Sequence, residues 1–212
     1  MRTRDWTTQS ANRARRLARA APFAQGKNVA ASDVAALLEA VVEPGDRVCL
    51  EGNNQKQADF LAKALASVDP AKIHDLHMVQ SVIALPEHLE IFDRGIASKL
   101  DFSFSGPQGG RLAKLAASGR LAIGAIHTYL ELFGRYFVDL TPKVSLIAAQ
   151  AADRTGNLYT GPNTEDTPVI VEATAFKSGI VIAQVNEVRE RLPRVDVPAD
   201  WVDFAARFDG PK

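Results

Sequence analysis

Residues 47–61 read RVCLEGNNQKQADFL, and the fold prediction starts from this stretch. The apolar run at 47–50 predicts a short buried strand, and Gly52 is expected to take a backbone angle that other residues avoid, which permits a tight turn. Apolar residues beyond position 59 recur at helical spacing, which predicts a helix with one buried face. A strand that ends in such a turn before a helix directs backbone N–H groups to the strand's carboxyl end, where open α/β sheets bind anions. The stretch lacks the three-glycine dinucleotide motif and the phosphate-loop lysine, so alone it does not specify a ligand.

The same alternation of strand and helix extends along most of the chain. Strands are predicted at 47–51, 74–80, 100–105, 121–126, 144–149 and 180–185, and helices at 7–20, 32–41, 55–67, 87–93, 112–119 and 129–138. Residues 168–176 include the strand-forming run VIV, but their apolar side chains share one helical face, so we predict a helix there. Residues 201–204 alternate like an edge strand. Because the strands are almost wholly apolar, we predict an α/β fold with a mostly parallel sheet and helices on both faces.

Composition restricts the class of protein. The chain has 212 residues, enough for one large α/β domain, and its 25 basic residues are balanced by 25 acidic ones. That balance provides no positive electrostatic field to attract nucleic acid or an anionic membrane. No apolar run approaches the roughly 20 residues of a membrane span. The single cysteine, Cys49, lies inside an apolar strand and is expected to be a buried hydrophobic residue. We therefore expect a cytoplasmic protein without nucleic-acid or membrane partners.

The N-terminus departs from this charge balance. Six arginines occur in the first 19 residues, with Asp5 as the only acid. Arginine-rich, acid-poor segments occur in mitochondrial transit peptides, but also in surface helices that dock on the protein body or on a partner. We favour the second interpretation and divide the chain into a basic helical arm, 1–27, and an α/β domain, 28–212.

Several residues suggest catalysis or metal binding but lack the necessary companions. His74 and His77 lie three apart on a strand and so point to opposite faces, and neither has ligands at metal-site spacing. His88 lies in a polar helix and is expected to be solvated. Ser105 precedes a glycine but lacks the frame of a nucleophile elbow. Glu51 is either a catalytic carboxylate or, as we favour, a partner of the backbone or of a lysine.

Polar turns at the strand ends are better candidates for binding. Such turns hold a carboxylate, carbonyl or phosphate through N–H donors. The candidate substrate-binding residues are Gly52, Asn53, Asn54, Gln57, Ser105, Gly106, Gln108, His127 and Asn163. An alternative for Asn54 is the cap of the following helix, with Gln57 in the capping-box position. These residues do not assemble a nucleophile, a base and an oxyanion hole.

Longer stretches carry a specific resemblance. They are LEGNNQKQADFLAKAL, HDLHMVQSVIALPEHLEIF, LDFSFSGPQGGRLA, GAIHTYLELFGRYFVDLTP and AADRTGNLYTGPNTEDTPVIVEATAF. From about Asn28 to Phe204, the chain resembles the alpha subunits of malonate decarboxylase. That family is related to family I coenzyme A transferases and to the alpha subunit of citrate lyase.

The resemblance implies a three-layer α/β fold of the coenzyme A transferase type. It also implies an activity, the exchange of malonate for acetate on the thioester of an acyl-carrier subunit, followed by decarboxylation in other subunits. The thioester is carried by the partner's phosphoribosyl-dephospho-coenzyme A arm, so no cofactor is expected on this chain itself. Whether the chain also forms a homo-oligomer is left open.

The chain departs from the family pattern in length. The family's alpha subunits have two similar domains, and the related transferases place their nucleophilic glutamate in the second. This chain ends at Lys212, so we expect only the first domain, with the nucleophile beyond Lys212 and the second domain covering apolar surface near 201–208. Two interpretations stay open: the substrate-binding half of a transferase, and an association module that is inactive alone. A sugar-phosphate isomerase or nucleotide-binding domain is suggested by fold analogy only.

Overall fold

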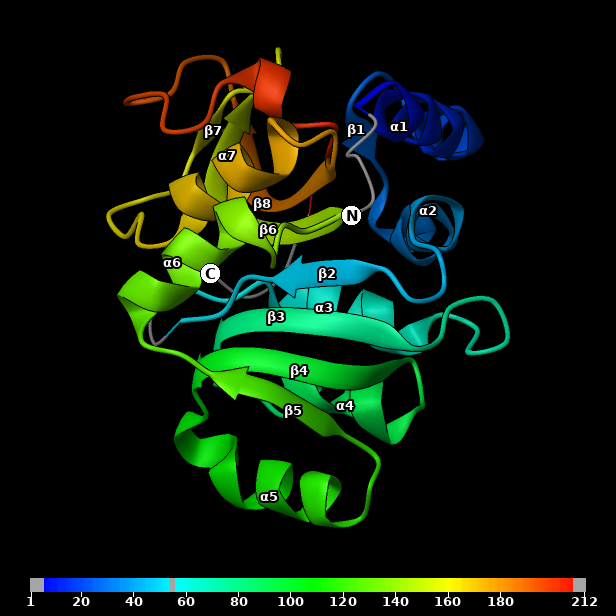
Figure 1. Cartoon of the computed structure of the whole chain (residues 1–212). Coiled ribbons are helices and arrows are strands. Elements are labelled where there is room, and N and C mark those ends of the chain that lie inside the picture. Colours follow the sequence, from blue (N-terminus) through cyan, green and yellow to red (C-terminus); the bar gives the residue numbers. More distant parts are fainter. Residues whose placement is uncertain (1–5, 54–55, 208–212) are drawn as a thin grey trace.

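The computed structural model describes residues 6–53 and 56–207. Nine strands form one sheet in the order β1-β9-β8-β6-β2-β3-β4-β5, with β7 paired to β6 (Figure 1). The strands are β1 Asn28–Val29, β2 Arg47–Leu50, β3 Leu76–Val82, β4 Ala97–Phe104, β5 Ala122–Ile126, β6 Val144–Asp153, β7 Leu158–Tyr159, β8 Ile180–Arg189 and β9 Phe204–Arg207. The pairing of β6 with β7 is antiparallel, and the other strand pairings are parallel. The sheet is therefore mostly parallel, as predicted.

Helices cover both faces of this sheet. They are α1 Trp6–Ala20, α2 Val34–Val41, α3 Asp59–Ser67, α4 Glu87–Asp93, α5 Gly109–Ala117, α6 Tyr129–Val138 and α7 Thr167–Ala175. One hydrophobic core contains side chains from α2 to α5, and a second contains side chains from α6 and α7. Figure 1 shows α6 and α7 in front of the sheet and α3 and α4 behind it. The predicted three-layer fold is confirmed. None of the helices in the described ranges is long and apolar enough to cross a bilayer.

The run at 168–176 shows why periodicity outweighs strand propensity. It forms α7, as predicted, and buries Ile170, Val171 and Ala173 in the second core. A strand would have pointed Ile170 and Val171 to opposite faces, whereas a helix places both toward the sheet.

Two boundary predictions are wrong. Helix α3 begins at Asp59 rather than at 55, and its N-cap is Ala58, so Gln57 is not in a capping box. Gln57 instead forms an antiparallel bridge with Gly52, outside the helix. Asn54, the predicted cap, lies outside the described residues. The segment predicted as an edge strand at 201–204 is also different, since β9 starts at Phe204 and lies between β8 and β1.

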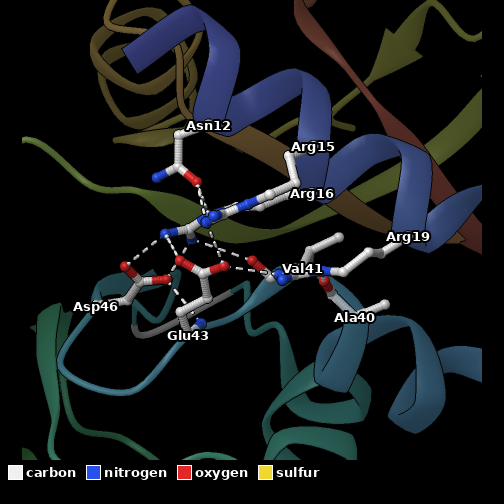
Figure 2. A network of polar contacts seen from close by, with 8 residues as sticks. All are labelled: Asn12, Arg15, Arg16, Arg19, Ala40, Val41, Glu43 and Asp46. Carbon is white, nitrogen blue, oxygen red and sulfur yellow. Dashed lines mark hydrogen bonds and ion pairs between the residues drawn. The ribbon is translucent and has the colours of Figure 1, made fainter. Parts of the chain in front are cut away.

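Helix α1 is fixed to the domain by arginines. Arg16 is buried and binds both carboxylate oxygens of Asp46, and its Nη2 lies 2.8 Å from Glu43 Oε2. Figure 2 shows Arg15 and Arg19 of α1 pointing at the same glutamate. Arg15, Arg16 and Arg19 are thus neutralised by acids in the turn between α2 and β2.

Candidate functional site

A cavity of about 480 Å³ opens beside the carboxyl ends of β6 and β8 and the chain that follows β2. Its lining residues are Lys56, Gln57, Asp59, Ala148, Ala149, Gln150, Thr160, Gln184, Asn186 and Glu187. From β2 the chain adds β3, β4 and β5 on one side, and β6, β8 and β9 form the other side. The order of strands therefore reverses between β2 and β6, and such a switch point is where open α/β sheets bind ligands.

The turn after β2 depends on a close backbone approach. A Cβ on Gly52 would lie 2.6 Å from His88 Cε1 and 2.7 Å from the carbonyl oxygen of Val82, so only glycine fits. The amide of Gly52's neighbour, Asn53, donates to the carbonyl of Lys56 at 3.1 Å, and Asn53 Oδ1 accepts from the Lys56 amide at 2.7 Å. The asparagine thus closes the turn that brings Lys56 back toward the strand.

Glu51 and Lys56 form a buried ion pair at the end of β2. Glu51 Oε1 lies 3.0 Å from Lys56 Nζ and also accepts from the hydroxyl of Thr167, and Glu51 Oε2 accepts from the amide of Ala148 at 2.7 Å. Burial raises the pKa of Glu51, and Lys56 acts in the opposite direction. The expected lysine and backbone contacts of Glu51 are confirmed. Because every contact of this carboxylate is internal, it fixes the site rather than facing the cavity.

A second buried carboxyl lies next to this pair. Asp166, the residue before α7, accepts a hydrogen bond from Ser81, and burial raises its pKa. Asp166 also contributes to the raised pKa of Glu51. Nearby, Cys49 Sγ lies 3.5 Å from Tyr136 Oη, and burial raises the pKa of the Cys49 thiol. The expectation that Cys49 is a buried hydrophobic residue is confirmed.

Side-chain amides dominate the wall of the cavity. Gln184 Oε1 accepts from the Leu61 amide at 3.1 Å, and Gln184 Nε2 donates to Asp59 Oδ1 at 2.9 Å, which ties β8 to the first turn of α3. Gln57, Gln150 and Asn186 add further amides to the lining. Since an amide both donates and accepts, this wall suits carbonyl and amide groups of a ligand. Lys56 is the cationic side chain of the lining, but it is paired with Glu51, and Asp59 and Glu187 add two carboxylates to the wall.

Comparison with known proteins assigns the chain to a family. The sequence profile of the family described as "Malonate decarboxylase, alpha subunit, transporter" matches residues 5–212. The chain belongs to the malonate decarboxylase alpha subunit family. It is 60% identical over 190 residues to the acetyl-S-ACP:malonate ACP transferase of Malonomonas rubra, covering 90% of this chain and 34% of that protein. The chain therefore spans about a third of the length of this relative.

Solved structures agree with the family assignment. A Pseudomonas malonate decarboxylase hetero-tetramer, solved in complex with malonate, matches with a TM-score of 0.95 and 55% identity. The match covers 99% of this chain and 39% of that one. Glutaconate coenzyme A-transferase from Acidaminococcus fermentans matches with a TM-score of 0.66 at 13% identity, over 85% of this chain and 75% of that one. The latter similarity shows the fold alone, and that fold is the predicted coenzyme A transferase type.

Only part of the predicted substrate-binding set gathers at this cavity. Gln57 lines it, and Gly52 and Asn53 form the adjoining turn. Asn54 lies outside the described residues. Asn163 lies in the loop before α7, where its Nδ2 donates to Glu165 Oε1 at 3.4 Å.

The turn after β4 lies farther away. Ser105, Gly106 and Gln108 are at the same edge of the sheet, but β3 separates β4 from β2. Two strand spacings correspond to roughly 10 Å. A role for these residues in substrate binding stays a prediction.

His127 is held in a separate cluster. Its Nε2 lies 2.8 Å from Asp101 Oδ1, and His77 Nε2 lies 2.6 Å from Asp101 Oδ2. Burial favours a higher pKa for Asp101, but the hydrogen bonds from His127 and His77 outweigh it, and the pKa is lowered. Gly124 is required beside it, because a Cβ there would lie 2.1 Å from Asp101 Oδ2. In the described part of the chain, no group of three or more His, Cys, Asp or Glu side chains is arranged to hold a metal ion.

Sequence reasoning missed Lys56, Gln184 and Asp166, and it was wrong about His88. His88 was expected to be solvated, yet it is completely buried beneath the Gly52 turn. Lys56 could have been found, because it lies within the quoted turn and Glu51 was expected to contact a lysine. Gln184 offered a weaker signal, a polar residue in the apolar strand IVIAQV.

Proposed function

We propose that this chain is the substrate-binding part of an enzyme subunit that exchanges malonate for acetate on an acyl-carrier-protein thioester. The supporting observation is the 60% identity over 190 residues to an acetyl-S-ACP:malonate ACP transferase. The cavity at the switch point supports the same function, because its amides and its lysine match a ligand with carbonyl and carboxylate groups.

The exchange converts malonate and an acetyl thioester into a malonyl thioester and acetate. When a carboxylate oxygen attacks the thioester carbonyl carbon, an acyl anhydride forms, the C–S bond breaks and the sulfur leaves as a thiolate. Attack of this thiolate on the anhydride that contains the malonyl group forms the malonyl thioester and releases the other carboxylate. Negative charge develops on the carbonyl oxygen. Each hydrogen-bond donor placed there lowers the activation free energy by about 3–4 kcal/mol in comparable sites. We assign Lys56 and Gln57 to hold the substrate carboxylate or this oxygen, since both line the cavity next to the turn. The attacking glutamate is proposed to lie in the part of the relatives that this chain does not match.

The thioester sulfur would be supplied by the phosphoribosyl-dephospho-coenzyme A arm of an acyl-carrier subunit. Coenzyme A-like arms contain amides and a hydroxyl, and the side chains of Gln57, Gln150 and Asn186 are suited to bind such groups. The proposed partners are the carrier subunit and the decarboxylase subunits, and the proposed location is the cytoplasm.

An association module is the second candidate, and exposed apolar side chains favour it. Phe104, Ile126, Tyr129 and Leu130, at the ends of β4 and β5 and the start of α6, are all substantially exposed. The tail expected to carry such surface does not, since Phe204 to Ala206 are buried in the sheet. A surface of this kind is typical of a contact with another domain or subunit.

Exchange of labelled malonate into the thioester of the carrier protein tests the proposal. The complete alpha subunit would be compared with its Lys56→Ala and Gln57→Ala variants, using Lys63→Ala on the exposed face of α3 as the control. Loss of a donor to the developing charge is expected to reduce kcat by about 10²-fold. Wild-type exchange in both site variants would show that this cavity is not the substrate site.

A further inference from the structure

A buried histidine lies directly under the turn that borders the cavity. His88, on α4, has no exposed surface, and neither of its ring nitrogens makes a hydrogen bond of good geometry with the described residues, although the carbonyl of Val82 lies close enough to the ring to favour its charged form. Gln57 Oε1 is likewise buried without a partner there. Burying unpaired polar atoms is costly, and an aliphatic side chain would fill the same space without that cost. Packing alone therefore does not explain an imidazole at this position.

The position of the ring is defined by Gly52. A Cβ on Gly52 would lie 2.6 Å from His88 Cε1 and 3.1 Å from Gln57 Oε1. Because Cε1 lies between the two ring nitrogens, the nitrogen-bearing edge of the imidazole faces the backbone of the turn. On the neighbouring side, the carbonyl of Gly52 accepts a hydrogen bond from the Val82 amide at 3.0 Å. The start of the turn is thus clamped between the end of β3 and the ring.

The ring also leaves the electrostatics of the site undisturbed. Burial lowers the pKa of His88 to about 4, although Glu87, the Val82 carbonyl and Asp59 act in the opposite direction. The imidazole is therefore neutral at physiological pH. A neutral ring can support the turn without adding a charge near the buried pair of Glu51 and Lys56.

The turn transmits this support to the cavity wall. Gly52 is bridged to Gln57, and Asn53 Oδ1 accepts from the amide of Lys56 at 2.7 Å. We propose that His88 is a positioning residue, which fixes the backbone of the Gly52 turn so that Lys56 and Gln57 stand at the wall of the cavity. This role rests on the proposed function, because it assigns His88 an effect on exchange through those two side chains. Without the ring, the turn can relax into the space beneath it and displace both side chains.

The test uses the complete alpha subunit with its carrier protein. His88→Ala is expected to lower kcat/KM for malonate exchange by about 10²-fold, the loss that a displacement of about 1 Å causes at other sites. His88→Gln, which keeps a polar side chain of similar length, is expected to recover at least part of that loss. His74→Ala is the matched control, because His74 is exposed and pairs with Asp75 at the far end of β3.

A double variant separates positioning from a general structural effect. In a Lys56→Ala/Gln57→Ala background, adding His88→Ala is expected to cause less than a twofold further loss, since the side chains that it positions are already gone. An undiminished loss in that background overturns the positioning role, as does wild-type exchange by His88→Ala. Wild-type exchange by Lys56→Ala/Gln57→Ala overturns the proposed substrate site and, with it, this role. If His88→Ala does not fold, the same comparisons are made with His88→Val, which leaves a smaller space beneath the turn and lacks the ring.

Discussion

Single side chains around the Gly52 turn have separate tasks. Gly52 is needed because no Cβ fits between His88 and Val82. Asn53 closes the turn through its side-chain oxygen, and Lys56 neutralises Glu51 below it. Substitutions at these positions should therefore differ in what they change.

Replacing Asn53 with Ala tests whether this residue is structural, substrate-binding or both. Loss of its bond to the Lys56 amide is expected to lower the free energy of unfolding by about 1 kcal/mol. If Asn53 also contacts substrate, exchange by the complete subunit falls by about 10²–10³-fold, more than the stability loss explains. Urea denaturation and exchange measured on the same variant separate the two roles. Asn53→Asp keeps the accepting oxygen and is the matched control, and early melting with normal turnover would leave the turn purely structural.

The raised pKa of Asp166 predicts that the stability of the fold depends on pH. Burial raises its pKa above the ordinary 3.8, so the folded state holds a proton that the unfolded state releases. The stability that this proton provides is complete below about pH 4 and is lost as the pH rises through the higher folded value. Asp166→Asn retains the acceptor for Ser81 but does not titrate. The variant should therefore gain stability relative to the parent between pH 4 and pH 7, and urea midpoints that differ equally at both pH values would contradict this.

At the scale of elements, two helices show how tertiary contacts change what local sequence suggests. Helix α3 starts late because the bridge between Gly52 and Gln57 takes precedence over the helical pattern. Helix α1 is rich in arginine, yet its central arginine is buried. Figure 2 shows Arg16 reaching between Glu43 and Asp46.

The Arg16 clamp should dominate the stability that α1 contributes. Arg16→Met leaves Asp46 buried without its partner, which is expected to cost about 3–5 kcal/mol of unfolding free energy. Arg15→Met removes a more exposed ion pair with Glu43 and should cost about 0–1 kcal/mol. Chemical denaturation of both variants measures the difference. Arg16→Met/Asp46→Asn should recover part of the loss, and equal effects of the two single variants would show that Arg16 is not the anchor.

At the scale of the whole molecule, the sheet places the cavity at the boundary between two sets of strands. The exposed apolar side chains at Phe104, Ile126 and Leu130 lie near the same carboxyl edge, beyond β3. The chain spans 34% of the curated relative and 39% of the matched chain in the solved hetero-tetramer. The position of the cavity and of the exposed apolar side chains supports the proposed substrate-binding role.

The 212-residue chain alone is therefore expected to show no malonate/acetate exchange above background. The physical reason is that the proposed attacking glutamate is not among its residues. Incubation with labelled malonate and an acetyl-carrier thioester checks this, with the complete alpha subunit as the positive control. An acyl anhydride found on any glutamate of this chain would contradict the prediction.

The sequence by itself determined the layers of this protein. Apolar strands separated by amphipathic helices leave few alternatives to a parallel sheet covered on both faces, and periodicity correctly chose a helix for α7. The turn at Gly52 was also visible, but the reason for its glycine was not. Gly52 does not have the predicted unusual backbone angle, and it is His88 and Val82 that leave no room for a Cβ. The family, too, was visible, through long matching stretches such as LEGNNQKQADFLAKAL.

Only the tertiary structure decided which polar residues meet. Lys56 and Thr167 both contact Glu51, and they also bond to each other although 111 positions separate them in the sequence. Gln184 of β8 contacts the first turn of α3. His88 lies in a helix that reads as polar, but it is buried because the turn after β2 folds over it. Contacts between distant strands depend on register and packing, which no local pattern encodes. The strand ends were therefore predictable as a site, whereas the side chains that form its wall were not.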